Sequence, residues 1–107
     1  MEKSMLLETI GSTIENRIID FLIEGKGLDY SKTDIADGCE ISRPTLYKIL
    51  PFLLKNGVVK STRKIGRTTL YSINGQSEKV KVLLKLEEFL LKKSFEGFEK
   101  QKVKARI

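Results

Sequence analysis

The stretch that decides the fold is TDIADGCEISRPTLY, residues Thr33 to Tyr47. Ser31, just before it, is a favoured helix N-cap, and Asp34 follows three residues later, where a capping box places an acidic side chain. Ser42 is a second cap residue, and only a turn-length segment separates it from the first helix. The sequence therefore predicts a short helix over 32–38, a tight turn over 39–41 and a second helix from Arg43 to about Asn56.

The helix that starts at Arg43 has one interruption. Its apolar residues recur every three or four positions and predict one buried stripe: Leu46, Ile49, Leu50 and Leu53. Pro51 has no amide proton, and its ring crowds the carbonyl of Tyr47. A kink or a short 3₁₀ segment is therefore expected there.

A further helix is expected before this pair, over about 13–24. Ser12 is its expected N-cap, because Glu15 follows three residues later and completes a capping box. Its apolar face is predicted to hold Ile14, Ile18, Phe21 and Leu22. Leu28–Tyr30, between this helix and the next, is a candidate for a short strand.

Two segments rich in Val, Thr, Tyr and Ile follow the helices and predict a β-hairpin. They span residues 58–64 and 68–73, and Ile65-Gly66-Arg67 connects them. The buried face of the hairpin is expected to hold Val59, Tyr71 and Ile73.

The last segment predicts a long helix, capped near Ser77, whose apolar side chains form two stripes. One stripe holds Val80, Leu84, Leu91, Phe95 and Phe98, and the other holds Val82, Leu83, Leu86, Phe89 and Leu90. A surface helix needs only one apolar stripe, so we expect the second one to form the interface of a homodimer. The alternative is a helix buried within its own protomer. The chain then divides into a domain over 1–76, which includes an N-terminal extension, and a dimerisation helix over 77–107.

Charge is distributed unevenly along the chain. Residues 1–41 hold four basic and nine acidic side chains, whereas residues 42–76 hold seven basic side chains and no acidic one. Residues 77–107 hold nine basic and five acidic side chains. The acid-free segment covers the second helix of the pair and the hairpin. It predicts a one-sided positive field, which is the electrostatic footprint of a phosphate-binding surface.

Composition disfavours several chemistries. The chain has no histidine and a single cysteine, Cys39, so the usual transition-metal ligands and the commonest general base are missing. We therefore expect no enzymatic activity, no catalytic residue, no metal and no cofactor. Cys39 is expected to be a small buried residue, with a redox switch as the alternative. No apolar run is long enough to span a membrane and no signal peptide is recognised, so a cytoplasmic protein is expected.

The order of these elements resembles a winged helix-turn-helix. Thr33–Tyr47 is similar to the helix-turn-helix core, Asn56–Val59 to the entry into the wing, and Gly66–Asn74 to the wing and its return strand. The resemblance covers about residues 10–76 and is greatest to the MarR/ArsR/PadR-like group of bacterial and archaeal regulators. It implies a mostly α-helical fold, with a three-helix core, a small β-hairpin wing and a long C-terminal dimerisation helix. Glu40 is a departure, because that group usually has glycine at this turn position, where φ is positive.

The resemblance implies a homodimeric transcription regulator, most often a repressor, that binds double-stranded DNA. Its recognition helix would enter the major groove with Ser42, Arg43, Pro44, Thr45, Tyr47 and Lys48. Its wing would meet the minor groove with Arg63, Lys64, Arg67 and Thr68. Arg43 is the best candidate to read a guanine edge, because its guanidinium can bond O6 and N7 together.

Two other interpretations stay open at this point. Winged helices also serve as protein-interaction modules in transcription or replication assemblies, and a fold does not fix a function. A surface that binds another protein, however, does not require a segment without acidic residues, so the charge distribution favours DNA as the partner. An enzyme or a metal sensor is disfavoured by the missing histidine.

Overall fold

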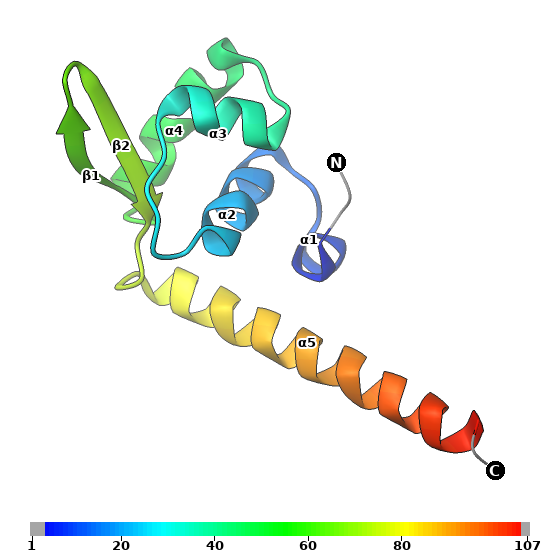
Figure 1. The fold of residues 1–107 in the computed structure, drawn as a ribbon. Coiled ribbons are helices and arrows are strands. Elements are labelled where there is room, and N and C mark those ends of the chain that lie inside the picture. The colour runs from blue at the N-terminus through cyan, green and yellow to red at the C-terminus, as the bar shows by residue number, and fades with distance from the viewer. Residues whose placement is uncertain (1–3, 106–107) are drawn as a thin grey trace.

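The computed structural model describes the backbone of residues 4–105 and the side chains of residues 4–96. Figure 1 shows a group of short helices, a two-stranded hairpin beside them and one long helix that extends past the group. The elements are α1 (Met5–Ile10), α2 (Ile14–Glu24), α3 (Lys32–Cys39), α4 (Arg43–Lys55), β1 (Val59–Ile65), β2 (Thr68–Ile73) and α5 (Glu78–Ala105). The predicted mostly α-helical fold with one hairpin and a long C-terminal helix is confirmed.

Helix α1 was not predicted, because six residues are too few for a periodic apolar pattern. Ser4 caps it, and the Ser4 Oγ accepts a hydrogen bond from the amide of Leu7 at 3.1 Å. The same hydroxyl donates to the carboxylate of Asp20 at 2.8 Å. Asp20 is buried on α2, so this bond satisfies a buried charge and fastens α1 to α2.

Helix α2 starts one residue later than predicted. Thr13, rather than Ser12, is its N-cap, and the Thr13 Oγ1 accepts from the amide of Asn16 at 3.1 Å. In this register the side-chain amide of Asn16 donates to the carbonyls of Ile10 and Gly11, at 3.3 and 3.0 Å. The one-residue shift therefore lets α2 close the C-terminal end of α1.

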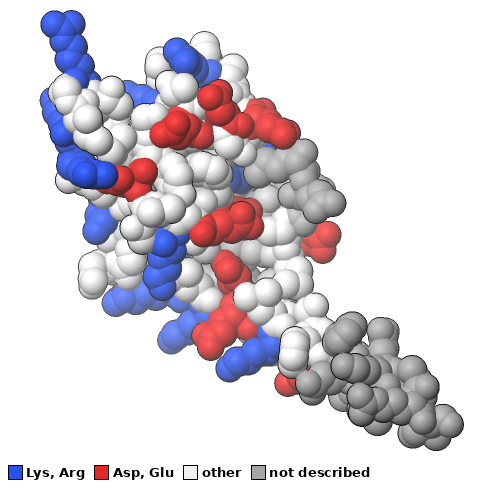
Figure 2. All heavy atoms as spheres, in the orientation of Figure 1, with Lys and Arg blue, Asp and Glu red and all other residues white. Residues whose placement is uncertain are grey.

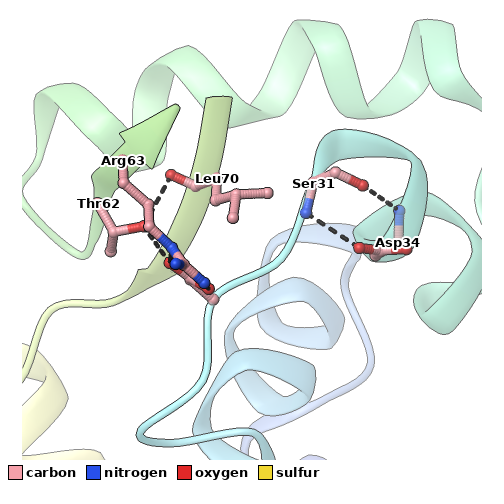
Figure 3. Close-up of polar contacts among 6 residues, drawn as sticks. Ser31, Asp34, Thr62, Arg63 and Leu70 are labelled. Carbon is pink, nitrogen blue, oxygen red and sulfur yellow. Dashed lines mark hydrogen bonds and ion pairs between the residues drawn. The ribbon is translucent and has the colours of Figure 1, made fainter. Parts of the chain in front are cut away.

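The helix–turn–helix stretch folds as predicted. Ser31 and Asp34 form the expected capping box of α3, with reciprocal bonds of 3.1 and 3.2 Å between side chain and backbone (Figure 3). Glu40 follows α3 in the left-handed conformation, with φ 55° and ψ 44°. The chain therefore keeps the positive-φ turn although it carries a side chain there, which costs about 1 kcal/mol.

Helix α4 is α-helical from end to end, so the 3₁₀ segment expected at Pro51 is absent. Pro51 is exposed, whereas Leu46, Leu50 and Leu53 are buried on the opposite side of the helix. We attribute the continuity of α4 to this packing, which compensates for the one backbone hydrogen bond that proline cannot donate.

One apolar core joins the helices to the hairpin. Its members include Ile18, Ile19, Leu22, Ile35, Ala36, Leu46, Leu50, Leu53, Val58, Val59, Tyr71 and Ile73. The predicted buried face of the hairpin is therefore confirmed. From the predicted face of α2, Ile18 and Leu22 are buried, Phe21 is half-buried and Ile14 is exposed.

The hairpin pairs Val59 with Ile73 at its base and Ile65 with Thr68 at its tip. Its turn is shorter than predicted, because Ile65 belongs to β1 and only Gly66 and Arg67 connect the strands. Gly66 has a φ of 62°, as a tight hairpin turn requires.

Only part of the short strand predicted at Leu28–Tyr30 forms. Tyr30 makes an isolated bridge to Tyr71, with two backbone hydrogen bonds of 2.8 Å. This bridge holds the α2–α3 loop against the free edge of β2, so the loop and the hairpin lie side by side.

Helix α5 is about 40 Å long for its 28 residues, and Figure 1 shows that its second half extends beyond the other elements. Val80 is buried, and Leu83, Leu84 and Leu86 pack against the core of the same chain. Leu83 and Leu86, which were expected on the stripe for a partner, are thus half-buried against their own core. Among the side chains of α5 that the structure describes, residues 78–96, the large apolar ones that are exposed are Val82, Phe89, Leu91 and Phe95. The side chain of Phe98, expected on the first stripe, lies outside the described side chains.

Candidate nucleic-acid interface

The first turn of α4 is organised by its cap. The Ser42 Oγ accepts from the amide of Thr45 at 3.2 Å and lies 2.7 Å from the Thr45 Oγ1. Arg43 and Pro44, between them, are exposed. The positive end of the helix dipole is thus open to solvent beside a cationic side chain, which favours an anion there.

The outward face of α4 continues from this turn. Because Leu46 and Leu50 face the core, Tyr47 and Lys48 point to solvent, and Tyr47 is 51% exposed. Arg43 and Tyr47 stand four residues apart, so they are neighbours on the surface of the helix. Arg43 and Tyr47, two of the expected recognition residues, therefore lie beside each other on the exposed surface of α4.

Lys32 extends this face from α4 to α3. It is the first residue of α3, and its Nζ lies 5.0 Å from the centre of the Tyr47 ring, within the range of a cation–π contact. Lys32 was not predicted as a site residue, because it belongs to the acid-rich first third of the chain. Its position at the start of the predicted helix, directly after the N-cap Ser31, is the sequence feature that could have identified Lys32 as a candidate site residue.

A polar groove of about 190 Å³ connects Lys32 to the hairpin. It is lined by Ser31, Lys32 and Thr33 at the start of α3, and by Arg67, Thr68, Thr69 and Tyr71 of the hairpin. Lys64 pairs with Thr69 across the hairpin, and paired residues point to the same face of a sheet. Cations from α3 and from the hairpin tip therefore converge on one side of the molecule. We call the exposed side of α4, Lys32 and this groove the basic surface.

Arg63 does not join the basic surface, contrary to the prediction. Its partner in the hairpin is Leu70, and its Nε and Nη2 donate to the carboxylate of Asp29 at 3.0 and 3.3 Å. Asp29 also accepts from the Thr62 Oγ1 at 2.7 Å (Figure 3). The hydrogen bonds from Arg63 and Thr62 lower the pKa of Asp29, and the same ion pair raises the pKa of Arg63. Thr62 stands where the register shifts between Ser61 and Arg63.

Charge separates across the molecule. Figure 2 shows Lys and Arg side chains gathered along the hairpin, at the left of the view, whereas Asp and Glu side chains lie mainly over the helices to its right. A further group of basic side chains lies near the start of α5, with acidic ones among them. On the face shown in Figure 2, basic side chains therefore predominate along the hairpin and acidic ones over the helices.

No protein-family model and no curated protein matches the sequence, whereas several solved structures share its fold. HlyU from Vibrio cholerae is 25% identical, with a TM-score of 0.59 over 79% of this chain and 83% of that chain. MepR, a transcription regulator of a Staphylococcus aureus multidrug efflux pump, is 16% identical, with a TM-score of 0.62 over 94% of this chain and 78% of that chain. NadR in complex with 4-hydroxyphenylacetate is 26% identical, with a TM-score of 0.60 over 89% of this chain and 66% of that chain.

The chain is a winged helix-turn-helix protein. In this winged helix, α3 and α4 form the helix-turn-helix, α4 takes the place of the recognition helix, and the β1–β2 hairpin is the wing. The resemblance that the sequence carries over residues 10–76 is therefore confirmed at the level of the fold. Among the described residues, no helix combines the length and the apolarity that a bilayer crossing requires, and no cluster of potential ligands fits a metal ion.

Cys39 lies behind the basic surface, at the end of α3. It is fully buried, and its thiol donates to the carbonyl of Arg17 at 3.6 Å. Burial raises the pKa of the Cys39 thiol to about 11. Since the thiolate is the reactive form, alkylation by iodoacetamide at pH 8 should be at least about a hundred-fold slower in the folded protein than in the unfolded chain. A time course read by mass spectrometry, with and without guanidinium chloride, checks this, and equal rates would contradict a buried, inert thiol.

Proposed function

We propose that this chain binds double-stranded DNA as a homodimer and regulates transcription by that binding. The observation that carries the proposal is the continuity of the basic surface, in which Tyr47, Lys32 and Arg67 join three elements. A winged helix of the same fold, a variant of MepR with a single substitution, is known bound to an oligodeoxyribonucleotide. That complex supports DNA as the partner of this fold.

Helix α4 would enter the major groove, which is about 12 Å wide and admits one α-helix. Arg43, exposed on its first turn, would read a guanine edge, and Thr45 would contact a thymine methyl group or a phosphate. Ser42, Pro44, Tyr47 and Lys48 would complete the contact along the same side of the helix.

The wing would contact the neighbouring minor groove. Arg67 stands at its tip, beside Thr68, and an arginine there responds to the width and potential of the groove more than to base identity. Lys64 would add to the same contact. Lys32, between α4 and the wing, would bind the phosphates that separate the two grooves, so these three cations supply affinity rather than specificity.

The exposed apolar residues of α5 would form the dimer interface with the same helix of a second copy. Val82, Phe89, Leu91 and Phe95 are each more than half exposed. At about 100° per residue, Val82 and Phe89 stand on one side of the helix and Leu91 and Phe95 on the other, so a second copy would cover parts of both stripes. The proposed interface keeps Val82 and Phe89 from the predicted stripe, with Leu90 beside them, and gains Leu91 and Phe95. A dimer would present two α4 helices to half-sites roughly 34 Å apart. A dimer bound to both half-sites within a promoter would block the access of RNA polymerase to that promoter. Repression is therefore the expected outcome.

Replacing Lys32 and Arg67 by glutamine tests the basic surface. We expect the double variant to bind all duplex sequences more weakly, and the slope of log affinity against log salt to fall by about one for each phosphate that is no longer bound. Fluorescence anisotropy with a mixed-sequence duplex at several salt concentrations measures both quantities. The matched control is Lys81→Gln/Lys85→Gln, which removes two exposed lysines of α5. Binding that is independent of salt, or an equally weakened affinity in both variants, would refute DNA binding by this surface and favour a protein partner.

A further inference from the structure

We propose that a second pocket, on the other side of the wing from the basic surface, binds a small organic anion with an apolar body. The pocket has a volume of about 530 Å³ and lies between the α2–α3 loop, the outer side of the hairpin and the start of α5. Pockets of this size are typical of small-molecule sites in proteins. The proposed function makes no use of it.

Three cations line this pocket against one carboxylate. Lys26 comes from the α2–α3 loop, and Lys60 and Arg63 come from β1. Asp29 is the single acidic residue of the lining, and its carboxylate is occupied by Arg63 and Thr62. Within residues 4–96, Lys26 and Lys60 form no ion pair with a protein group. The pocket therefore keeps a net positive charge that an anion would neutralise.

Arg63 is already oriented for such an anion. Its guanidinium carries five N–H donors, and Asp29 takes up only those on Nε and one side of Nη2. The side chain is 63% exposed, so the remaining donors face the solvent of the pocket. Because Asp29 holds the guanidinium in place, less rotamer entropy is lost when its free edge binds a carboxylate, phosphate or sulfonate.

The apolar part of the lining indicates the chemistry of the rest of the ligand. Leu28, Ile73 and Leu84 line the pocket together with the cations. Leu28 is 63% exposed, and an apolar ligand group would remove it from water. An inorganic anion or a DNA phosphate leaves this wall uncovered, and a neutral lipid leaves the cations unpaired. The lining thus fits a molecule with one anionic group and an apolar ring or chain.

The fluorescent anion 8-anilinonaphthalene-1-sulfonate tests the pocket without DNA, so the result is independent of the proposed function. We expect it to bind the intact protein and to bind Lys26→Gln/Lys60→Gln with a dissociation constant raised about five-fold or more. The matched control, Lys81→Gln/Lys85→Gln, should bind like the unaltered protein. N-phenyl-1-naphthylamine, which has the same rings without the sulfonate, should bind more weakly.

A second pair of variants separates this pocket from the exposed face of α5. Leu28→Asp places a negative charge in the pocket and should abolish the fluorescence gain, whereas Ile65→Asp changes an equally exposed residue at the tip of the wing and should not. Both positions are exposed, so neither change threatens folding. No binding, equal binding of the neutral dye, or equal binding to Leu28→Asp and to the unaltered protein would each overturn the proposal.

Discussion

Replacing Phe95 by glutamate is expected to convert the protein from a dimer to a monomer and to lower its affinity for duplex DNA by roughly a hundred-fold. Phe95 is 63% exposed and lies on the part of α5 that no other described element covers. In a two-fold symmetric interface each substitution occurs twice, so two carboxylates would lose water without gaining partners. A monomer would bind a single half-site, without the increase in affinity that comes from linking two.

Ser94→Glu is the matched control for this variant, because it places the same charge on an exposed polar residue directly beside Phe95 in the chain. Sedimentation equilibrium measures the association state, and anisotropy measures binding to one palindromic duplex. The helix content measured by circular dichroism should be the same for both variants, since Phe95 is not part of the core. A Phe95→Glu protein that stays dimeric would remove this face of α5 from the interface.

The proposed dimer face on α5 also shows the limit of prediction from the sequence. Helical periodicity located the long helix and its apolar residues, because both depend on spacing alone. It did not reveal that Leu83 and Leu86, which were expected on the stripe for a partner, are half-buried against their own core. Whether a residue of α5 is covered depends on how far the rest of the domain extends along the helix. Helical periodicity gives the direction of each side chain around the helix axis, but it does not give that distance. For the same reason a deletion of α5 is a poor test of dimerisation, since it would also remove the buried Val80.

Local chemistry made the helix-turn-helix predictable. The cap residues Ser31 and Ser42 and the spacing of Leu46 and Leu50 are short-range signals, and the structure follows them. The basic surface was predicted less completely, because the sequence gives the order of charges along the chain but not which of them lie close together in space. Lys32 reaches Tyr47 from an acidic segment, and Asp29 reaches across to Arg63 in the segment without acids. Both contacts join residues that are distant in sequence, so only the fold brings them together.

The last prediction concerns base recognition. Replacing Arg43 by alanine is expected to weaken binding to the preferred site by about ten- to a hundred-fold, which corresponds to the removal of one bidentate hydrogen-bonded pair with guanine. Binding to unrelated duplexes should weaken much less, because Arg43 then contributes one charge among several. The preference between sites should therefore collapse.

Arg67→Ala separates recognition from charge, because it also removes one exposed arginine but from the tip of the wing. It should weaken binding to preferred and unrelated duplexes by the same factor and leave their ratio unchanged. The preferred site would first be selected from a random duplex pool at two salt concentrations, and competition experiments would then give the ratio for each variant. An Arg43→Ala protein that retains the site preference would assign base recognition to other residues on the exposed face of α4. The contrast between the two arginines follows from their positions, since a helix in the major groove meets base edges whereas a wing tip meets the backbone and the shape of the minor groove.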